Sequence, residues 1–378
     1  MMRGAAGGGK CAGLASLLWR LESSGVAGQL GRMRGLGSGA AEARIKKNKK
    51  SHIHLKPLKQ ICIPVLEHFD KKYRQEHGEL WDKVREVLLF PCSWQYGVLV
   101  NKFSDYEALE QFLHSQGYWN FLQDALSISQ HPLRCYISEG QSRFPRLLHQ
   151  AERLKEYYLL NAASLLPVLA LDVQDGECVL DMCAAPGGKS VAIMQYATPR
   201  NLYCNEHDIL RHKWLKETLE SFVPRDLRGL VSVTNKDGRN VGPQQPQVFN
   251  KVLVDVPCSN DRSWLFSSDV LKACKRIVHT PNLPVLQKQL LRSAVEALCP
   301  GGTMVYSTCT LSRAENDDVV ASLLNSCDNI QTVDLTDLAC SFSHSFTFAE
   351  DVQYGQLIVP EKGKPWGPMY VSKLWKTH

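Results

Sequence analysis

The feature that most constrains the fold is an alternation of strand and helix patterns that begins near residue 177. Short apolar runs, typical of buried strands, alternate with longer segments of helical periodicity. Strands are expected at 178–181, 202–205, 230–234, 248–255, 303–307, 345–348 and 369–373. Helices are expected at 189–195, 208–222, 283–299 and 314–325. Alternating units of this kind predict an α/β fold with a doubly wound, mostly parallel sheet of seven strands.

The part of the chain before this pattern is expected to be mainly helical. Apolar residues repeat at helical spacing from residue 60 to about 118, whereas 126–150 contains several helix breakers and reads as a loop or a short strand connection. Two helices, 152–161 and 162–171, are predicted to meet near Pro167. We therefore expect a helical N-terminal region at 60–150 and the α/β domain at 151–378.

The first forty residues have the composition of a mitochondrial transit peptide. They are rich in Gly, Ala, Ser and Leu and contain five basic residues but a single acid, Glu22. We expect residues 1–40 to be a transit-like segment and the protein to lie in the mitochondrial matrix; a disordered Gly-rich tail is the alternative. No apolar run reaches the roughly 20 residues that cross a bilayer, so no membrane partner is expected.

The net charge of +6 is unevenly distributed, because six lysines lie between residues 46 and 59. Such a run favours a phosphate-bearing partner, although a solvated linker explains it equally well. We assign residues 41–59 to a basic linker. The thirteen cysteines form no CxxC pair, so neither a disulfide framework nor a bound metal is expected.

A glycine-containing turn follows the first predicted strand, in the segment Leu-Asp-Met-Cys-Ala-Ala-Pro-Gly-Gly-Lys-Ser at 180–190. Gly187 and Gly188 allow the backbone to approach a ligand closely. A phosphate-binding P-loop would need glycine at the position of Cys183, and the dinucleotide fingerprint G-x-G-x-x-G is absent. The third interpretation is a loop that holds a nucleoside with an amino-acid tail.

Acidic residues follow four successive strands, at Asp181, Glu206, Asp237 and Asp255. Each alone is most often a helix cap, but four at one edge of a sheet suit a cationic ligand rich in hydroxyl groups. S-adenosylmethionine has both properties and is the predicted cofactor. The predicted cofactor-binding residues are Cys183, Ala184, Ala185, Pro186, Gly187, Gly188, Lys189, Glu206, Asp237 and Asp255.

Two cysteines follow predicted strands, Cys258 in Val-Asp-Val-Pro-Cys-Ser and Cys309 in Tyr-Ser-Thr-Cys-Thr. Parallel sheets place active-site groups just beyond the carboxyl ends of their strands. Two thiols there suggest covalent chemistry on a substrate. The alternative is an inert buried thiol, which is our expectation for Cys183, Cys204, Cys299 and Cys327.

Three segments, 181–189, 255–258 and 307–309, together resemble the signature of the Sun-domain RNA cytosine-5 methyltransferases. The resemblance extends over roughly residues 60–375, with one departure at Val256, where the family usually has alanine. Segments 160–167 and 259–264 favour the mitochondrial members that modify a tRNA anticodon-loop (wobble) cytosine.

The resemblance implies S-adenosylmethionine-dependent methylation of cytosine C5 through a covalent intermediate. Cys309 would be the nucleophile that adds to C6, and Cys258 would assist loss of the C5 proton or release of the adduct. Asp255 would bind the N3/N4 edge of the base. Lys189 would anchor that carboxylate or lower a thiol pKa, since a nearby cation favours thiolate.

The expected partner is RNA, with mitochondrial tRNA favoured over rRNA and the protein acting as a monomer. Region 60–150 would bind the RNA and 151–378 would be the methyltransferase catalytic domain. A non-catalytic RNA-binding or ribosome-assembly factor and a P-loop NTPase are the alternatives, and DNA is disfavoured only by the resemblance. Basic residues expected to contact the RNA backbone are Lys71, Lys72, Arg74, Arg143, Arg146 and Arg153.

Overall fold

The structure, a computed structural model, describes residues 60–91, 94–126, 133–140, 144–147 and 153–377. The predictions for residues 1–40 and 41–59 and for Arg143 lie outside these ranges. Within them, no helix combines the length and the apolar character that crossing a membrane requires.

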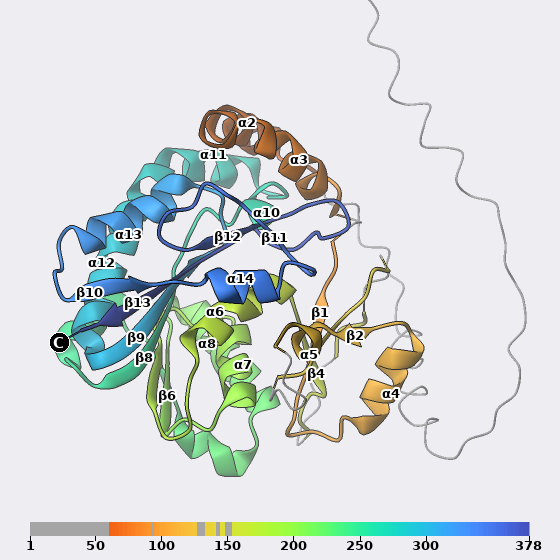
Figure 1. Cartoon of the computed structure of the whole chain (residues 1–378), viewed down its shortest axis with the longest axis vertical. Helices are drawn as coiled ribbons and strands as arrows, with labels where there is room; N and C mark the ends of the chain where they lie inside the picture. The colour runs from red at the N-terminus through yellow and green to blue at the C-terminus, as the bar shows by residue number, and fades with distance from the viewer. Residues whose placement is uncertain (1–59, 92–93, 127–132, 141–143, 148–152, 378) are drawn as a thin grey trace, which may run out of the picture.

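A nine-stranded sheet forms the centre of the molecule (Figure 1). Five strands are parallel in the order β7-β6-β5-β8-β9, and β13, β12 and β11 continue the sheet antiparallel from β9, while β10 pairs with β13. The strands are β5 (Cys178–Asp181), β6 (Asn201–Asn205), β7 (Val231–Thr234), β8 (Phe249–Asp255), β9 (Leu298–Thr308), β10 (Ile330–Val333), β11 (Thr347–Phe348), β12 (Gln356–Val359) and β13 (Met369–Lys376).

The predicted α/β fold with a mostly parallel central sheet is confirmed, but the expected number of seven strands is too low. The sequence pattern missed β10 and β12, each only four residues long. Both pair with the longer β13. Their structure therefore depends on pairing with another segment, which a short run of apolar residues does not reveal.

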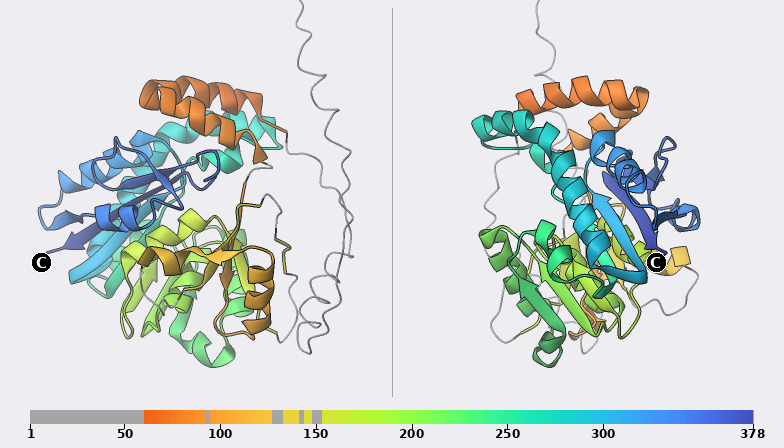
Figure 2. Two further views of the ribbon diagram at one scale, coloured as in Figure 1. Left: turned by 45° about the vertical axis from the view of Figure 1, so that its right-hand side comes forward. Right: turned by 90° about the vertical axis from the view of Figure 1, so that its left-hand side faces the viewer.

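Helices cover both faces of this sheet, as Figures 1 and 2 show. Along β8, Leu253 packs into one hydrophobic cluster, while Val252 and Val254 pack into the other. This alternation buries both faces, as a doubly wound fold requires. The helices of this part are α6 (Leu166–Leu171), α7 (Gly188–Tyr196), α8 (Ile209–Phe222), α9 (Val241–Gln244), α10 (Asp261–Trp264), α11 (Val270–His279), α12 (Leu283–Ala297), α13 (Asp317–Leu324) and α14 (Thr336–Ser341).

The N-terminal part begins with two helices, α2 (Ile63–His77) and α3 (Glu79–Leu88); α2 packs against α11, and α3 packs against α2. The N–H of Cys62 donates to the carbonyl of Leu265 at 2.8 Å, and the Phe69 and Trp264 rings meet edge to face. Helices were predicted here. Because α2 packs on the segment that follows β8, it supports the loops at the carboxyl edge of the large sheet.

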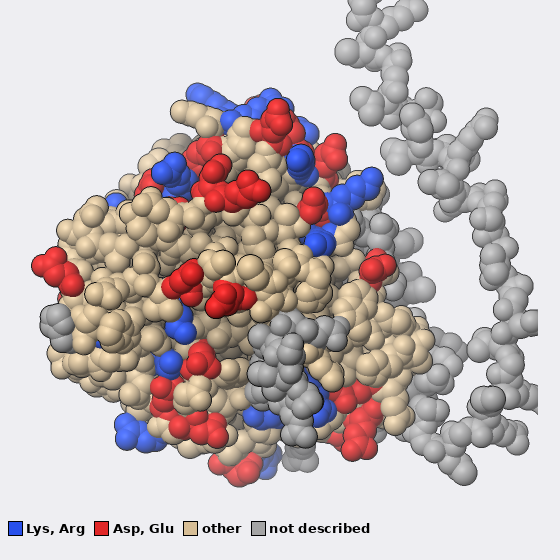
Figure 3. Space-filling model, viewed as in Figure 1, with Lys and Arg blue, Asp and Glu red and all other residues tan. Residues whose placement is uncertain are grey.

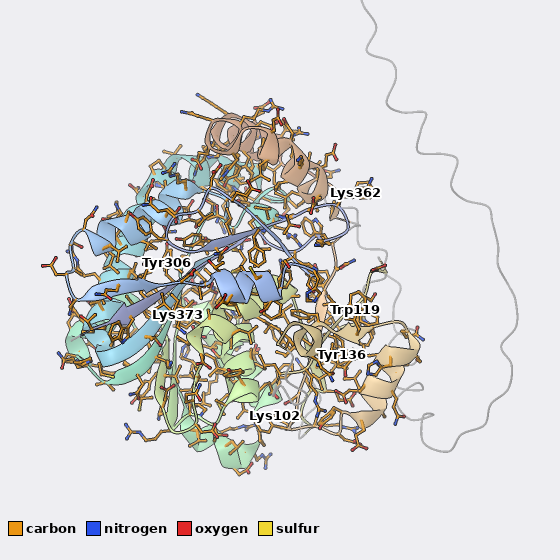
Figure 4. The ribbon with its side chains drawn as sticks, viewed as in Figure 1. Lys102, Trp119, Tyr136, Tyr306, Lys362 and Lys373 are labelled. Carbon is orange, nitrogen blue, oxygen red and sulfur yellow. The ribbon has the colours of Figure 1, made fainter. Side chains whose placement is uncertain are left out.

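A small antiparallel sheet follows, with strands in the order β2-β3-β1-β4. Figure 4 labels Trp119 and Tyr136 in this sheet and Tyr306 in the large one. The helix predicted at 152–161 is wrong, because Tyr157–Leu160 forms strand β4. Strand β4 pairs with β1, which lies inside the region 60–150 that was predicted to be helical. Elements here are β1 (Gly97–Val100), α4 (Glu107–Ser115), β2 (Trp119–Asn120), α5 (Phe121–Leu126), β3 (Cys135–Ile137) and β4 (Tyr157–Leu160).

The order of the parallel strands reverses between β5 and β8. In the order β7-β6-β5-β8-β9, the chain moves outward from β5 to β7 and then returns to the other side of β5. Loops after neighbouring strands diverge at such a point and leave a crevice at the carboxyl ends, where ligands of open α/β sheets bind. The predicted site residues follow β5, β8 and β9, and they converge on this edge.

Candidate active site

The register of β8 and β9 brings the two cysteine loops together. Asp255 at the end of β8 lies opposite Ser307 on β9, and the Ser307 hydroxyl donates to Asp255 Oδ1 at 2.9 Å. From this matched pair, Cys258 is reached after three residues and Cys309 after two. Their sulfur atoms lie 3.3 Å apart, and the Cys309 N–H donates to Cys258 Sγ at 3.3 Å.

The two thiols have different surroundings. Cys258 is buried, whereas Cys309 is half-buried. The hydrogen bond with Cys309, and then burial, raise the pKa of Cys258 well above its ordinary value. The protonated form of Cys258 is therefore favoured, and the more exposed Cys309 sulfur is the one that a substrate can reach.

Lys189 and Asp255 form an ion pair beside the thiols. Lys189 Nζ donates to Asp255 Oδ2 at 2.7 Å from the first turn of α7. Burial lowers the pKa of Lys189, but the charge and hydrogen bond of Asp255, with smaller contributions from Cys309 and Asp181, raise it overall. The ammonium therefore stays charged and fixes the orientation of the carboxylate.

Two carboxyl groups at the ends of β5 and β6 are buried with unused acceptor capacity. Asp181 Oδ2 accepts from the Ser190 hydroxyl at 2.6 Å, but its buried Oδ1 has no hydrogen-bond partner. Glu206 Oε2 also lacks a hydrogen bond, although Arg211 Nη1 lies 3.2 Å away in an ion pair. Burial raises the pKa of Asp181 to about 7. Such acceptors fit the hydroxyl groups and positive charge of the predicted cofactor.

The turn between β5 and α7 has the conformation that its glycines allow. Gly187 has φ of 106°, a left-handed conformation that disfavours other residues. A Cβ on Gly188 would lie 2.8 Å from the Tyr158 ring. Arg211 Nη2 also fixes the turn by donating to the carbonyl of Ala185 at 2.6 Å. This places main-chain groups of residues 183–188 at the crevice, as predicted.

Asp237 lies after β7, as predicted, and is held by a neighbouring arginine. Arg239 Nε lies 3.0 Å from each of its carboxylate oxygens. This hydrogen bond lowers the pKa of Asp237. Next to it, Asn205 connects strand ends by donating to the carbonyls of Met182 and Lys236 at 3.1 and 3.0 Å. Asn205 was not identified from the sequence.

Further residues missed from the sequence hold the backbone of the Cys258 loop. Arg276 Nη2 donates to the carbonyls of Cys258 and Ser259 at 2.8 and 2.6 Å. Buried Glu315 accepts from the Ser259 N–H at 2.9 Å and from Gln287 at 3.1 Å. These residues lie 17 to 56 positions from their partners, and no local motif marks them.

The Cys309 loop is fixed in the same way by Asp261, the first residue of α10. Its carboxylate accepts from Thr310 Oγ1 at 2.9 Å, the Leu311 N–H at 2.8 Å and the Tyr73 hydroxyl at 2.9 Å. Burial raises the pKa of Asp261 to about 7. Because Tyr73 comes from α2, the N-terminal helices contribute to the position of the Cys309 loop.

Known proteins match the chain over most of its length. A protein-family model described as 16S rRNA methyltransferase RsmB/F matches residues 168–374. A Mus musculus protein named tRNA (cytosine(34)-C(5))-methyltransferase, mitochondrial, is 56% identical over 319 residues, which cover 84% of this chain and 92% of the relative. The chain belongs to the RsmB/F methyltransferase family.

Other relatives have a different named substrate or establish only the fold. The Mus musculus 5-cytosine rRNA methyltransferase NSUN4 is 38% identical and matches 82% of this chain and 87% of its own. The crystal structure of NSun6 from Pyrococcus horikoshii with SFG covers 83% of this chain and 98% of its own, with a TM-score of 0.58 and 17% identity. At that identity it supports the fold alone.

Membership of the RsmB/F family confirms the predicted family, the methyltransferase activity and S-adenosylmethionine as the cofactor. The mitochondrial relative likewise confirms the predicted mitochondrial location. The roles of individual residues remain predictions.

In the described ranges, the eleven cysteines are free, and no three His, Cys, Asp or Glu side chains are grouped in a way that could hold a metal ion.

Proposed function

We propose that this RsmB/F family member methylates C5 of cytosine 34 in a mitochondrial tRNA. The supporting observation is the contact between Cys258 and Cys309 at 3.3 Å beside the Lys189–Asp255 pair. A relative named for this reaction at 56% identity supports the choice of substrate. The two thiols would have no role in a protein that only binds RNA.

The reaction begins with the sulfur of Cys309. C5 of cytosine is a poor nucleophile, but addition of a thiolate to C6 makes C5 an enamine-like carbon that can attack an electrophilic methyl group. S-adenosylmethionine supplies that methyl group as part of a sulfonium cation. Asp255, oriented by Lys189, binds the N3/N4 edge of the base and stabilises the adduct.

Product release requires loss of the C5 proton and cleavage of the bond between sulfur and C6. Cys258 would assist this second half as a thiolate, after its own proton has passed to water: it would accept the C5 proton, the C5–H electron pair would re-form the C5=C6 double bond, and the S–C6 bond would break to return Cys309 as a thiolate, 3.3 Å from Cys258. Residues 183–188 would hold the cofactor together with the carboxylates of Glu206, Asp237 and Asp181. The acceptor capacity of Asp181 and Glu206 supports this assignment.

RNA recognition is assigned to region 60–150 together with the edge of the catalytic domain. Of the predicted basic contacts, Lys71, Arg74, Arg146 and Arg153 are exposed. Lys72 instead donates to Ser312 Oγ at 2.6 Å, near the Cys309 loop. On the face that Figure 3 shows, basic and acidic side chains are interspersed over α2 and α3. We further propose that the protein acts as a monomer, which size-exclusion chromatography with light scattering would test.

The decisive experiment is methylation of purified tRNA and rRNA with labelled cofactor, followed by bisulfite mapping of the modified cytosine. Transfer to position 34 of a tRNA supports the proposal, whereas transfer confined to rRNA supports the second candidate, which the 38% identical rRNA methyltransferase favours. No transfer to either RNA would contradict the proposed substrate.

Cysteine variants test the assigned roles in the same assay. Cys309→Ala is expected to abolish transfer, whereas Cys258→Ala is expected to form an RNA adduct that survives a denaturing gel. Full activity of Cys309→Ala, with loss in Cys258→Ala, would reverse the two roles.

A further inference from the structure

Arg262, on the short helix α10, lies next to the nucleophile loop. The preceding residue, Asp261, donates its N–H to the Cys309 carbonyl at 3.4 Å, and its carboxylate accepts from the next two residues of that loop. Helix α10 is therefore fixed to the Cys309 loop by several hydrogen bonds. Arg262 therefore lies near the Cys309 sulfur, which is proposed to attack the base.

The Arg262 guanidinium has unused donor capacity. Its central carbon lies 4.7 Å from the centre of the Trp94 ring, and Nη2 donates to the carbonyl of Pro365. Its Nε is buried without a hydrogen-bond partner. Over the described ranges, no carboxylate pairs with Arg262, whereas Arg85, Arg211 and Arg239 each pair with one.

A half-buried guanidinium without a counter-ion, with its Nε fully buried, is unfavourable, so its site suits an anion that arrives with a ligand. Burial lowers the pKa of Arg262 to about 10, while the nearby Tyr96 and Cys309 raise it. The group is therefore still cationic at neutral pH. Its planar set of donors matches a phosphate.

We propose that Arg262 binds the phosphate on the 5′ side of the target cytidine. This inference rests on the proposed function. In the usual anti conformation of a pyrimidine nucleotide, C6 is the ring carbon that faces the 5′ phosphate. A sulfur placed at C6 therefore brings that phosphate to the Cys309 side of the base, where Arg262 lies. The contact also compensates for extruding the nucleotide from its loop.

The test removes each partner separately and then both together. Wild type and Arg262→Gln are assayed for single-turnover methyl transfer at subsaturating enzyme. The substrates are unmodified tRNA anticodon stem-loops and the same RNA with an uncharged methylphosphonate 5′ or 3′ of the target cytidine. In wild type we expect the 5′ methylphosphonate to slow transfer about 10- to 100-fold, the range for a hydrogen bond between charged groups. In Arg262→Gln the unmodified RNA should be slowed to a similar extent, and the 5′ modification should add little.

Controls separate phosphate binding from a purely structural role. Arg262→Lys keeps the charge and should recover part of the rate. Arg225→Gln removes the same charge from an exposed residue that precedes β7, on the side of the sheet where the parallel strands begin, and should react like wild type. The 3′ methylphosphonate should have a smaller effect than the 5′ one in every variant. Circular dichroism of each variant confirms folding.

Either of two results would overturn the assignment: an equal effect of the 5′ methylphosphonate in wild type and Arg262→Gln, or no effect in wild type. The second result needs no variant and holds even where Arg262→Gln fails to fold. If wild type transfers no methyl group to unmodified RNA, the proposed function itself fails, and the phosphate assignment fails with it.

Discussion

The buried Asp181 predicts a specific dependence of stability on pH. Its side chain is 1% exposed, and burial raises its pKa from 3.8 to about 7. The charged form is therefore disfavoured by folding. The stabilising contribution of Asp181 is complete below pH 4 and is lost as the pH rises through 7. At about 1.4 kcal/mol per pKa unit, this predicts a loss of about 2–3 kcal/mol between pH 5 and pH 8.

Asp181→Asn tests this value, because asparagine has nearly the same shape and cannot ionise. Urea unfolding of both proteins at pH 5, 6, 7 and 8 gives the difference in the free energy of unfolding at each pH. Asp261, whose pKa is also about 7, is present in both proteins, so its contribution cancels. We expect wild type to lose about 2–3 kcal/mol more than the variant over this range. Parallel pH profiles for the two proteins would refute the reasoning.

The same carboxyl group connects stability to cofactor binding. A bound sulfonium cation at this edge favours the ionised form of Asp181, so binding near pH 7 should release up to about half a proton. Calorimetry in two buffers with different ionisation enthalpies measures this release. Asp181→Asn should release less. Equal proton release by both proteins would show that Asp181 does not sense the cofactor.

Three further predictions concern the groups around the thiols. Lys189→Met removes the ammonium group that lies 2.7 Å from Asp255 and should slow methyl transfer about 10- to 100-fold. Lys189→Arg should recover part of the rate. Unchanged transfer in Lys189→Met would contradict the role of the ion pair. Arg276→Met removes two donors to the Cys258 loop and should lower the free energy of unfolding by about 1–3 kcal/mol, measured in urea, while Arg276→Lys should lose less. Hydrogen peroxide should oxidise Cys258 and Cys309 to a disulfide, because their sulfur atoms are in contact. Both thiol protons and two electrons pass to peroxide, which forms two waters. Mass spectrometry should find the linked peptides, and a thiol reductant should restore methyl transfer.

The large sheet could be predicted from sequence because its parallel strands and helices each carry their own periodic pattern. The residues after β5, β6, β8 and β9 were identified for the same reason, since topology alone brings the carboxyl ends of adjacent parallel strands to one edge. The small sheet could not be predicted in this way. Strand β4, predicted to be part of a helix, is four residues long and is stabilised by pairing with β1, 57 to 63 positions earlier.

The supporting residues of the site were missed for a related reason. Arg276, Glu315 and Asn205 act on backbone atoms of distant loops, and any loop offers the same N–H and C=O groups. A sequence motif consists of particular residue types at fixed spacing. These contacts have no fixed spacing, because they require only that a side chain in the folded protein points toward a backbone group. They became visible only when the fold placed both partners together.

The structure gives two similar strand-end cysteines different surroundings. The backbone at Cys258 is held by Arg276 and, through Ser259, by buried Glu315, while the hydrogen bond with Cys309 and burial raise the pKa of its thiol. Cys309 follows the last residue of β9 and remains half-buried at the crevice. A fixed, buried thiol beside a more accessible sulfur suits an addition at Cys309 followed by an elimination that Cys258 assists. These different surroundings support the proposed assignment of Cys309 as the nucleophile.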